Sequence, residues 1–168
     1  MILMRATYPL LRIWVKSPSL RGADILIVGE CVGELDKPAY HRLSKGKVVL
    51  TFCPEADPVS SALGKLSSII RSSAPRSISL LTVEGSPHCL TLHAALNEAL
   101  YVTKCAIPTE HYVLVGDEAV RISPDSVRVA RYLHLVDRLV RERADVLKEL
   151  ARHSLEYRLA CEARRGRR

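Results

Sequence analysis

Three short apolar segments of the sequence each lead into a cysteine. All three are rich in Val, Ile and Leu, which is typical of strands that are buried on both faces of a sheet. The segments are residues 23–30, 47–52 and 77–83, and the thiols that follow them are Cys31, Cys53 and Cys89. The carboxyl ends of parallel strands share one edge of a sheet, where ligands bind. The sequence therefore predicts that three distant thiols meet at one edge.

Helical patterns alternate with these segments. A short helical turn is expected at residues 40–43, a helix opened by Pro58 and Ser60 follows the second strand, and Pro87 suits the first position of a third helix. Residues 111–115 and 119–122, joined by a Gly-Asp-Glu turn, predict a β-hairpin. We expect a three-layer α/β sandwich with a mainly parallel sheet and right-handed crossovers.

The two ends of the chain are expected to extend this core. Residues 1–22 form an N-terminal extension, in which residues 10–16 suit either an extra strand or a short helix. At the other end, residues 123–126 cap a long C-terminal helix whose apolar stripe continues to Leu155. The predicted α/β domain spans residues 23–140. Residues 141–168 form a basic helical extension and tail. Because the apolar stripe of the helix continues into this extension, we expect the helix to pair with a second copy of the chain in a homodimer.

Composition narrows the class of protein. With 168 residues, 48% apolar and 26% charged, the chain suits one globular domain with a sizeable core. Five cysteines are an odd number without a regular framework, which favours reduced thiols over a disulfide scaffold. Charged residues and a proline interrupt the apolar N-terminus, so neither a signal sequence nor a membrane span is expected. A cytoplasmic protein without membrane contact is the expectation.

Several motifs occur in the order of a known family. These motifs are Glu30-Cys31-Val32, Tyr40-His41, Gly46-Lys47, Cys53-Pro54 with Asp57, and Pro87-His88-Cys89, and the region of resemblance covers roughly residues 23–123. Together they resemble the C-terminal α/β region of 4Fe-4S ferredoxin-like iron–sulfur proteins of anaerobic bacteria and archaea. The chain differs in lacking the ferredoxin module, since residues 1–22 contain no cysteine. His88 also stands where those proteins carry the first of two adjacent cysteines.

The resemblance implies a metal or redox context. It places Cys31, Cys53, His88 and Cys89 together as ligands of zinc or of an iron–sulfur cluster, because imidazole replaces thiolate in both kinds of site. A redox-protein partner is then expected. His41 and Asp57 would support the site, although Asp57 also suits a helix cap. His93, four residues after Cys89, is expected as a packing residue or a support of the ligands.

Other functions fit the same residues. Strand-end cysteines are often small core hydrophobes without a function. Cys89 at a helix N-terminus also suits a reactive nucleophile with a histidine base, because the helix dipole favours the thiolate. No Gly-x-Gly-x-x-Gly or Walker-type loop is present to favour a nucleotide.

Positive charge is concentrated at the C-terminal end. Residues 128–168 contain 12 Lys/Arg against 6 Asp/Glu, which accounts for most of the net charge of +7. Such a tail suits electrostatic binding of nucleic acid. A solvated, disordered terminus is the favoured explanation, because no recognised nucleic-acid module accompanies the tail. The candidate nucleic-acid contacts are Arg164, Arg165, Arg167 and Arg168.

Overall fold

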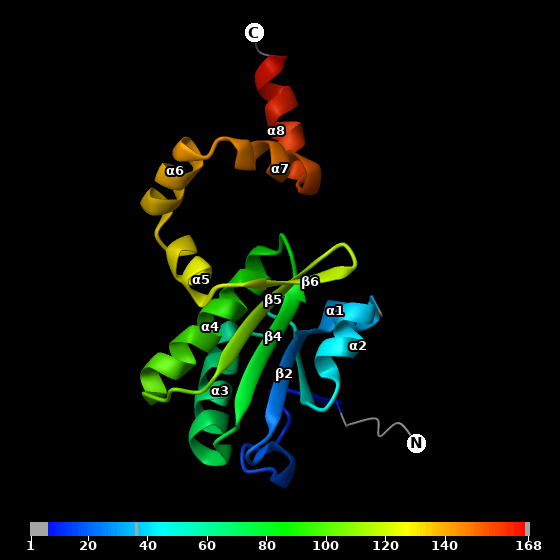
Figure 1. Cartoon of the computed structure of the whole chain (residues 1–168), viewed down its shortest axis with the longest axis vertical. Coiled ribbons are helices and arrows are strands. Elements are labelled where there is room, and N and C mark those ends of the chain that lie inside the picture. Colours follow the sequence, from blue (N-terminus) through cyan, green and yellow to red (C-terminus); the bar gives the residue numbers. More distant parts are fainter. Residues whose placement is uncertain (1–6, 36, 167–168) are drawn as a thin grey trace. The chain divides into compact units, whose positions relative to one another are not determined.

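The computed structural model describes residues 7–35 and 37–166 of the chain. Its contacts divide the chain into two compact units, residues 1–127 and residues 128–168. The first unit contains the sheet with its covering helices and the second consists of helices (Figure 1). The boundary expected between residues 140 and 141 falls inside a helix of the second unit.

The first unit is built on a six-stranded sheet with the order β1-β3-β2-β4-β5-β6. The first five strands are parallel, and β6 pairs with β5 in the antiparallel sense as the predicted hairpin requires. The strands are β1 (Thr7–Pro9), β2 (Asp24–Gly29), β3 (Val48–Phe52), β4 (Ser77–Val83), β5 (Thr109–Val115) and β6 (Glu118–Ile122). The three apolar segments therefore form the three central strands, which confirms the predicted parallel α/β core.

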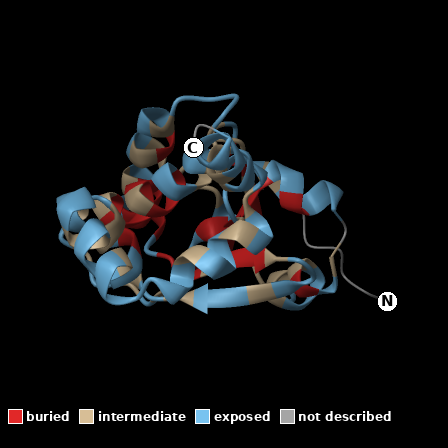
Figure 2. Cartoon of the chain, turned by 90° about the horizontal axis from the view of Figure 1, so that it is seen from above, coloured by how far each residue is buried: buried red, intermediate tan, exposed pale blue. Residues whose placement is uncertain are grey.

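Helices cover both faces of this sheet. One face packs against α3 (Val59–Ser73) and α4 (Pro87–Thr103), whose Leu66 and Leu96 are fully buried with Ile27 and Leu80 of the strands. The opposite face packs against α1 (Glu30–Glu34) and α2 (Pro38–Ser44). Figure 2 shows the buried residues in the strands and on the inner sides of these helices. The predicted three-layer sandwich is confirmed.

The hairpin is tied to the α1/α2 layer. Lys37, at the start of α2, donates a hydrogen bond to Asp117 in the turn between β5 and β6. Both residues lie at the carboxyl edge of the sheet, since β5 ends at this turn. The ion pair therefore joins segments 80 residues apart at the edge where the thiols are expected.

The N-terminal segment belongs to the core of the first unit. Its strand is β1, at residues 7–9, and residues 10–16 form turns instead of the extra strand or short helix that the pattern suggested. A 3-10 helix, η1 (Pro18–Leu20), follows. Leu10, Ile13 and Leu20 are buried against the α3/α4 face. Burial of these side chains holds the irregular segment in place without a regular element.

The prediction of one long C-terminal helix is wrong. The segment contains four helices, namely α5 (Pro124–Ala130), α6 (Leu133–Glu142), α7 (Asp145–His153) and α8 (Leu155–Arg165). Ser123 caps α5 as expected, because its hydroxyl accepts a hydrogen bond from the amide of Asp125. Tyr132 and Arg143 leave the helical conformation, with ψ of 83° and 62°. The described residues of α6, α7 and α8 include no buried one, so packing does not impose a continuous axis.

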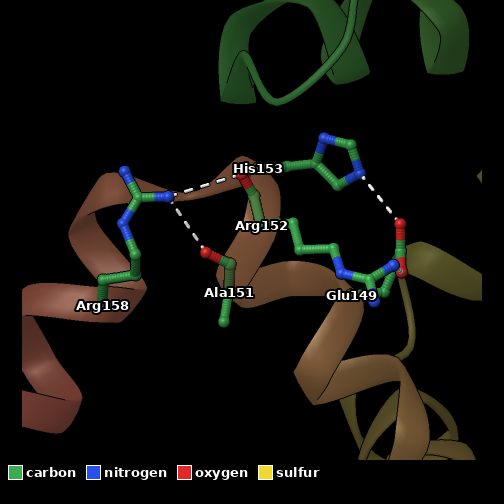
Figure 3. Close-up of polar contacts among 5 residues, drawn as sticks. All are labelled: Glu149, Ala151, Arg152, His153 and Arg158. Carbon is green, nitrogen blue, oxygen red and sulfur yellow. Dashed lines mark hydrogen bonds and ion pairs between the residues drawn. The ribbon is translucent and has the colours of Figure 1, made fainter.

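Side chains stabilise the break between α7 and α8. Arg158 Nη1 donates to the carbonyl oxygens of Ala151 and Arg152, at 3.0 and 3.3 Å (Figure 3). These carbonyls lie in the last turn of α7, where no further helical partner is available to them. Ser154 accepts a hydrogen bond from the amide of Tyr157 at 3.1 Å and begins α8. The guanidinium and the hydroxyl thus replace the hydrogen bonds that a continuous helix would make.

Glu149 anchors the last turn of α7. Its two carboxylate oxygens accept from Arg152 Nη1 at 2.7 Å and pair with His153 Nε2 at 3.2 Å (Figure 3).

Among the described residues, no helix combines the length and the apolar character needed to cross a bilayer.

Candidate functional site

The topology singles out the carboxyl ends of β2 and β4. The chain leaves β2 through α1 and α2 on one face of the sheet, and it leaves β4 through α4 on the other face. Because β2 and β4 are neighbours, their carboxyl ends flank the point where the connections diverge. In open α/β sheets ligands bind in the crevice at such a point.

Cys31 follows β2 at this point. It lies in the first turn of α1 and not in an open loop, as the second residue of the helix. Its side chain is exposed, although the neighbouring Val32 is fully buried and holds the turn on the sheet. The thiol is therefore accessible while its backbone is fixed.

Cys53 and Cys89 lie on either side of this position. Cys53 comes directly after β3, the other neighbour of β2, and its carbonyl accepts hydrogen bonds from the amides of Ala56 and Asp57 at 3.2 and 3.0 Å. Cys89 lies in the first turn of α4, where its amide donates to the hydroxyl of Ser86 at 3.3 Å. Both thiols are half-buried.

The surroundings of Cys31 alter the acid–base behaviour of its thiol. The pKa of the Cys31 thiol is raised above its usual value, first by burial and then by the negative charge that Cys53 would carry, with a smaller contribution from Cys89. The topology places all three cysteines after the carboxyl ends of the neighbouring strands β3, β2 and β4.

The fourth residue of the predicted ligand set is His88, which is exposed at the second position of α4. Across residues 7–35 and 37–166, no three His, Cys, Asp or Glu side chains are arranged as ligands of a metal ion. The donor types suit zinc or an iron–sulfur cluster, but the side chains of this conformation do not converge on one ion.

The predicted supporting residues have different places. His41 is exposed on α2, and its ring lies 5.4 Å from that of Tyr40. Asp57 is exposed and does not cap the following helix, because Pro58 is the N-cap residue and no side chain makes the capping hydrogen bond. The expected helix cap is therefore wrong. Asp57 instead lines a pocket of about 280 Å³ with Arg12 and Glu30.

His93 is part of a buried hydrogen-bonded chain behind this edge. Its Nε2 lies 2.9 Å from the hydroxyl oxygen of Thr82, and its Nδ1 lies 2.8 Å from Nδ1 of His111. Both ring nitrogens are thus engaged, which leaves His93 without a free donor atom for a metal in this conformation. The packing role expected for His93 agrees with this position.

Sequence reasoning missed Thr82 and His111 as partners of His93. Thr82 occupies the sixth position of β4, and His111 is fully buried in β5 opposite Leu80. The signal in the sequence was the alternation of side chains between the two faces of the strand, because His111 and Val113 share one face of β5. A histidine on a buried face requires a hydrogen-bond partner.

Burial changes the acid–base behaviour of this chain. The pKa of His93 is lowered to about 4, mainly because the charged imidazolium would lose its hydration and also because His111 would repel it. The imidazole of His93 is therefore neutral at neutral pH, and it acts as a hydrogen-bonding group of the core.

The predicted nucleic-acid contacts lie in the second unit. Arg164 and Arg165 are exposed in the last turn of α8. Arg167 and Arg168 lie outside the described residues.

Comparison with known proteins agrees with the fold. A sequence model of the Rossmann-like domain matches residues 17–168. Searches among curated proteins and among solved structures found no match. Because the matched range covers most of the chain and the observed sheet is open and mainly parallel, the protein belongs to the Rossmann-like domain family.

Proposed function

We propose that the protein binds a metal ion or an iron–sulfur cluster through the thiols of Cys31, Cys53 and Cys89. One observation carries the proposal: three cysteines from three separate connections follow the carboxyl ends of the neighbouring strands β3, β2 and β4. Thiolates are the preferred ligands of zinc and of iron–sulfur clusters. His88, one residue before Cys89, supplies the fourth donor.

The exposure of two of the four donors supports this proposal. Cys31 and His88 are not packed in the core, so rotation about their side-chain bonds is not opposed by burial. Cys53 and Cys89 are held by backbone hydrogen bonds at the edge. Binding then draws two exposed donors toward two thiols whose backbone is fixed. Deprotonation of Cys31 becomes easier beside a cation, which offsets its raised pKa.

The resemblance to iron–sulfur proteins belongs to this proposal as well. The family match reaches only the Rossmann-like domain, and a fold does not define a function. The ordered motifs around Cys31, Cys53 and Cys89 favour a redox role in which the protein works with a redox-protein partner. Zinc would give the site a structural role instead.

Metal analysis of anaerobically purified protein tests the proposal. We expect iron or zinc in the wild type and its loss in the Cys53→Ser/Cys89→Ser double variant. Cys105→Ser is the matched control, since Cys105 precedes β5 and so lies toward the amino ends of the strands. Absorption between 300 and 500 nm, roughly the range of thiolate–iron charge transfer, separates a cluster from zinc. Equally negligible iron and zinc in the wild type and the double variant would contradict the proposal.

A thiol-dependent enzyme is the alternative for the same edge. Cys89 would be the nucleophile, at the N-terminal turn of α4. Its neighbour on the same helix face, His93, has both ring nitrogens in hydrogen bonds, so the base would have to be another histidine. The metal site is favoured because it uses all three thiols.

A second candidate function is electrostatic binding of nucleic acid by the second unit. Its 12 Lys/Arg against 6 Asp/Glu and the exposed Arg164 and Arg165 support this function. Affinity for single-stranded RNA should fall steeply with salt and be lost when residues 164–168 are deleted. Unchanged binding after the deletion would contradict it. The expected homodimer is tested by the mass of the protein in solution.

A further inference from the structure

Strand register brings the segments that carry Cys31 and Cys53 to the same end of one strand pair. Gly29 of β2 pairs with Phe52 of β3, and neighbouring strands lie about 4.8 Å apart. Cys53 follows Phe52 directly, and Cys31 follows Gly29 by two residues. The α-carbons of disulfide-bonded cysteines are separated by roughly 4.4–6.8 Å. Two segments that leave adjacent strands side by side can therefore bring their cysteines within reach of a disulfide.

We propose that Cys31 and Cys53 form a reversible disulfide that makes the carboxyl edge sensitive to oxidation. The bond would link the first turn of α1 to the turn after β3. Both segments lie at the surface, so the bond would form and break without unfolding the core.

The different exposure of the two thiols determines which of them reacts first. Cys31 is exposed and Cys53 is half-buried, so a small reagent reaches Cys31 first. Strand register favours Cys53 as the partner of Cys31, because Cys53 directly follows the residue that pairs with the end of β2. Cys89, in contrast, comes six residues after the end of β4.

The oxidant is a low-molecular-weight disulfide. The Cys31 thiolate attacks one sulfur of this disulfide, forms a mixed disulfide and expels one thiolate. The Cys53 thiolate then attacks the sulfur of Cys31 and expels the second thiolate. In sum, two protein thiols lose two electrons and two protons, and one small disulfide becomes two small thiols.

The disulfide requires no metal, so it goes beyond the proposed function. One consequence does rest on that function: the bond would remove two of three thiolate ligands and would release a bound metal. The test is therefore made after treatment with a chelator, where failure of the metal site and failure of the disulfide are distinguishable.

Peptide mapping tests the inference on the full-length protein. The reduced protein is incubated with oxidised glutathione at pH 8, alkylated and digested with trypsin. Trypsin leaves the three thiols in separate peptides, residues 22–42, 48–65 and 77–104. We expect the first two peptides to be linked, with a mass about 2 Da below their sum. Reduction should separate them again.

Three variants make the result decisive. Cys89→Ser should still give the linked peptides, and Cys105→Ser should behave as the wild type. Cys53→Ser should instead accumulate glutathione on Cys31, because the second step has lost its nucleophile. Separate glutathione adducts on Cys31 and Cys53 in the wild type, or a link from Cys31 to Cys89, would overturn the inference. Unmodified thiols would do the same.

Discussion

His93 of α4 and His111 of β5 face each other in the core with their Nδ1 atoms 2.8 Å apart. One hydrogen fits between the two nitrogens, so one ring donates and the other accepts. Their centroids lie 5.1 Å apart with planes inclined by 32°. With Thr82, they join β4, α4 and β5 by side-chain hydrogen bonds directly behind the carboxyl edge.

Acid should weaken this core through His93. Its folded-state pKa is about 4, whereas an unfolded histidine has a pKa of 6.5, so the unfolded chain binds the proton more readily. The stabilising contribution is complete above pH 6.5 and is lost as the pH falls toward 4. Its size is about 3 kcal/mol, at 1.36 kcal/mol per pKa unit. Urea unfolding between pH 7 and 4.5 measures this loss.

The variant His93→Gln isolates this effect from the carboxylates that also titrate in acid. Its free energy of unfolding should depend less on pH than that of the wild type. His134→Gln, at an exposed residue of α6, is the matched control and should retain the wild-type dependence. A wild-type slope in His93→Gln would show that His93 does not titrate in this range.

The hydroxyl of Thr82 should stabilise the buried hydrogen-bonded chain that it forms with His93 and His111. Thr82→Val keeps the shape of the side chain but removes the partner of His93 Nε2, which is buried. A buried polar atom without a partner costs roughly 1–3 kcal/mol. Thr82→Ser retains the hydroxyl and should be less destabilised. Chemical denaturation at pH 7 compares the two, and equal losses would mean that the hydrogen bond contributes little.

The sheet could be predicted from sequence because its signals are local. Residues 23–30 and 77–83 are rich in Val, Ile and Leu, which is typical of strands that helices cover on both faces. The placement of Cys31, Cys53 and Cys89 after the carboxyl ends of three neighbouring strands followed from a general property of parallel sheets. The orientation of each side chain depends on rotamers and neighbours, which no local pattern specifies.

The hydrogen bond between His93 and His111 and the breaks between the C-terminal helices could not be predicted from local sequence patterns. His93 and His111 are 18 residues apart on different elements, and only the folded chain brings them together. At the C-terminus, the apolar stripe had the spacing of one helix, so the pattern favoured continuity. Ser154 and Arg158 supply competing hydrogen bonds at the break between α7 and α8, and the absence of buried residues leaves no packing to oppose them.

The reactivity of Cys31 should reveal its neighbours. Replacing Cys53 by serine removes the stronger of the two thiol influences that raise the pKa of Cys31. More of Cys31 should then be thiolate at pH 8, so iodoacetamide should modify it faster than in the wild type. Cys89→Ser should have a smaller effect and Cys105→Ser none. The modification is followed by mass spectrometry of the tryptic peptide of residues 22–42. Identical rates in the wild type and the three variants would show that the thiols do not interact.

The N-cap of α4 should matter for both stability and the thiol edge. The Ser86 hydroxyl accepts a hydrogen bond from the amide of Cys89, and the helix behind it buries Leu92 and Leu96. Ser86→Ala should lower the free energy of unfolding by about 1 kcal/mol, because the amide loses its partner. Ser86→Asp restores an acceptor and places negative charge at the helix N-terminus, so it should retain stability. Hydrogen exchange gives the local readout: the Cys89 amide should exchange faster in Ser86→Ala than in Ser86→Asp. If stability and exchange are the same in both variants, the cap does not hold Cys89 in place, and α4 is positioned by its buried leucines alone.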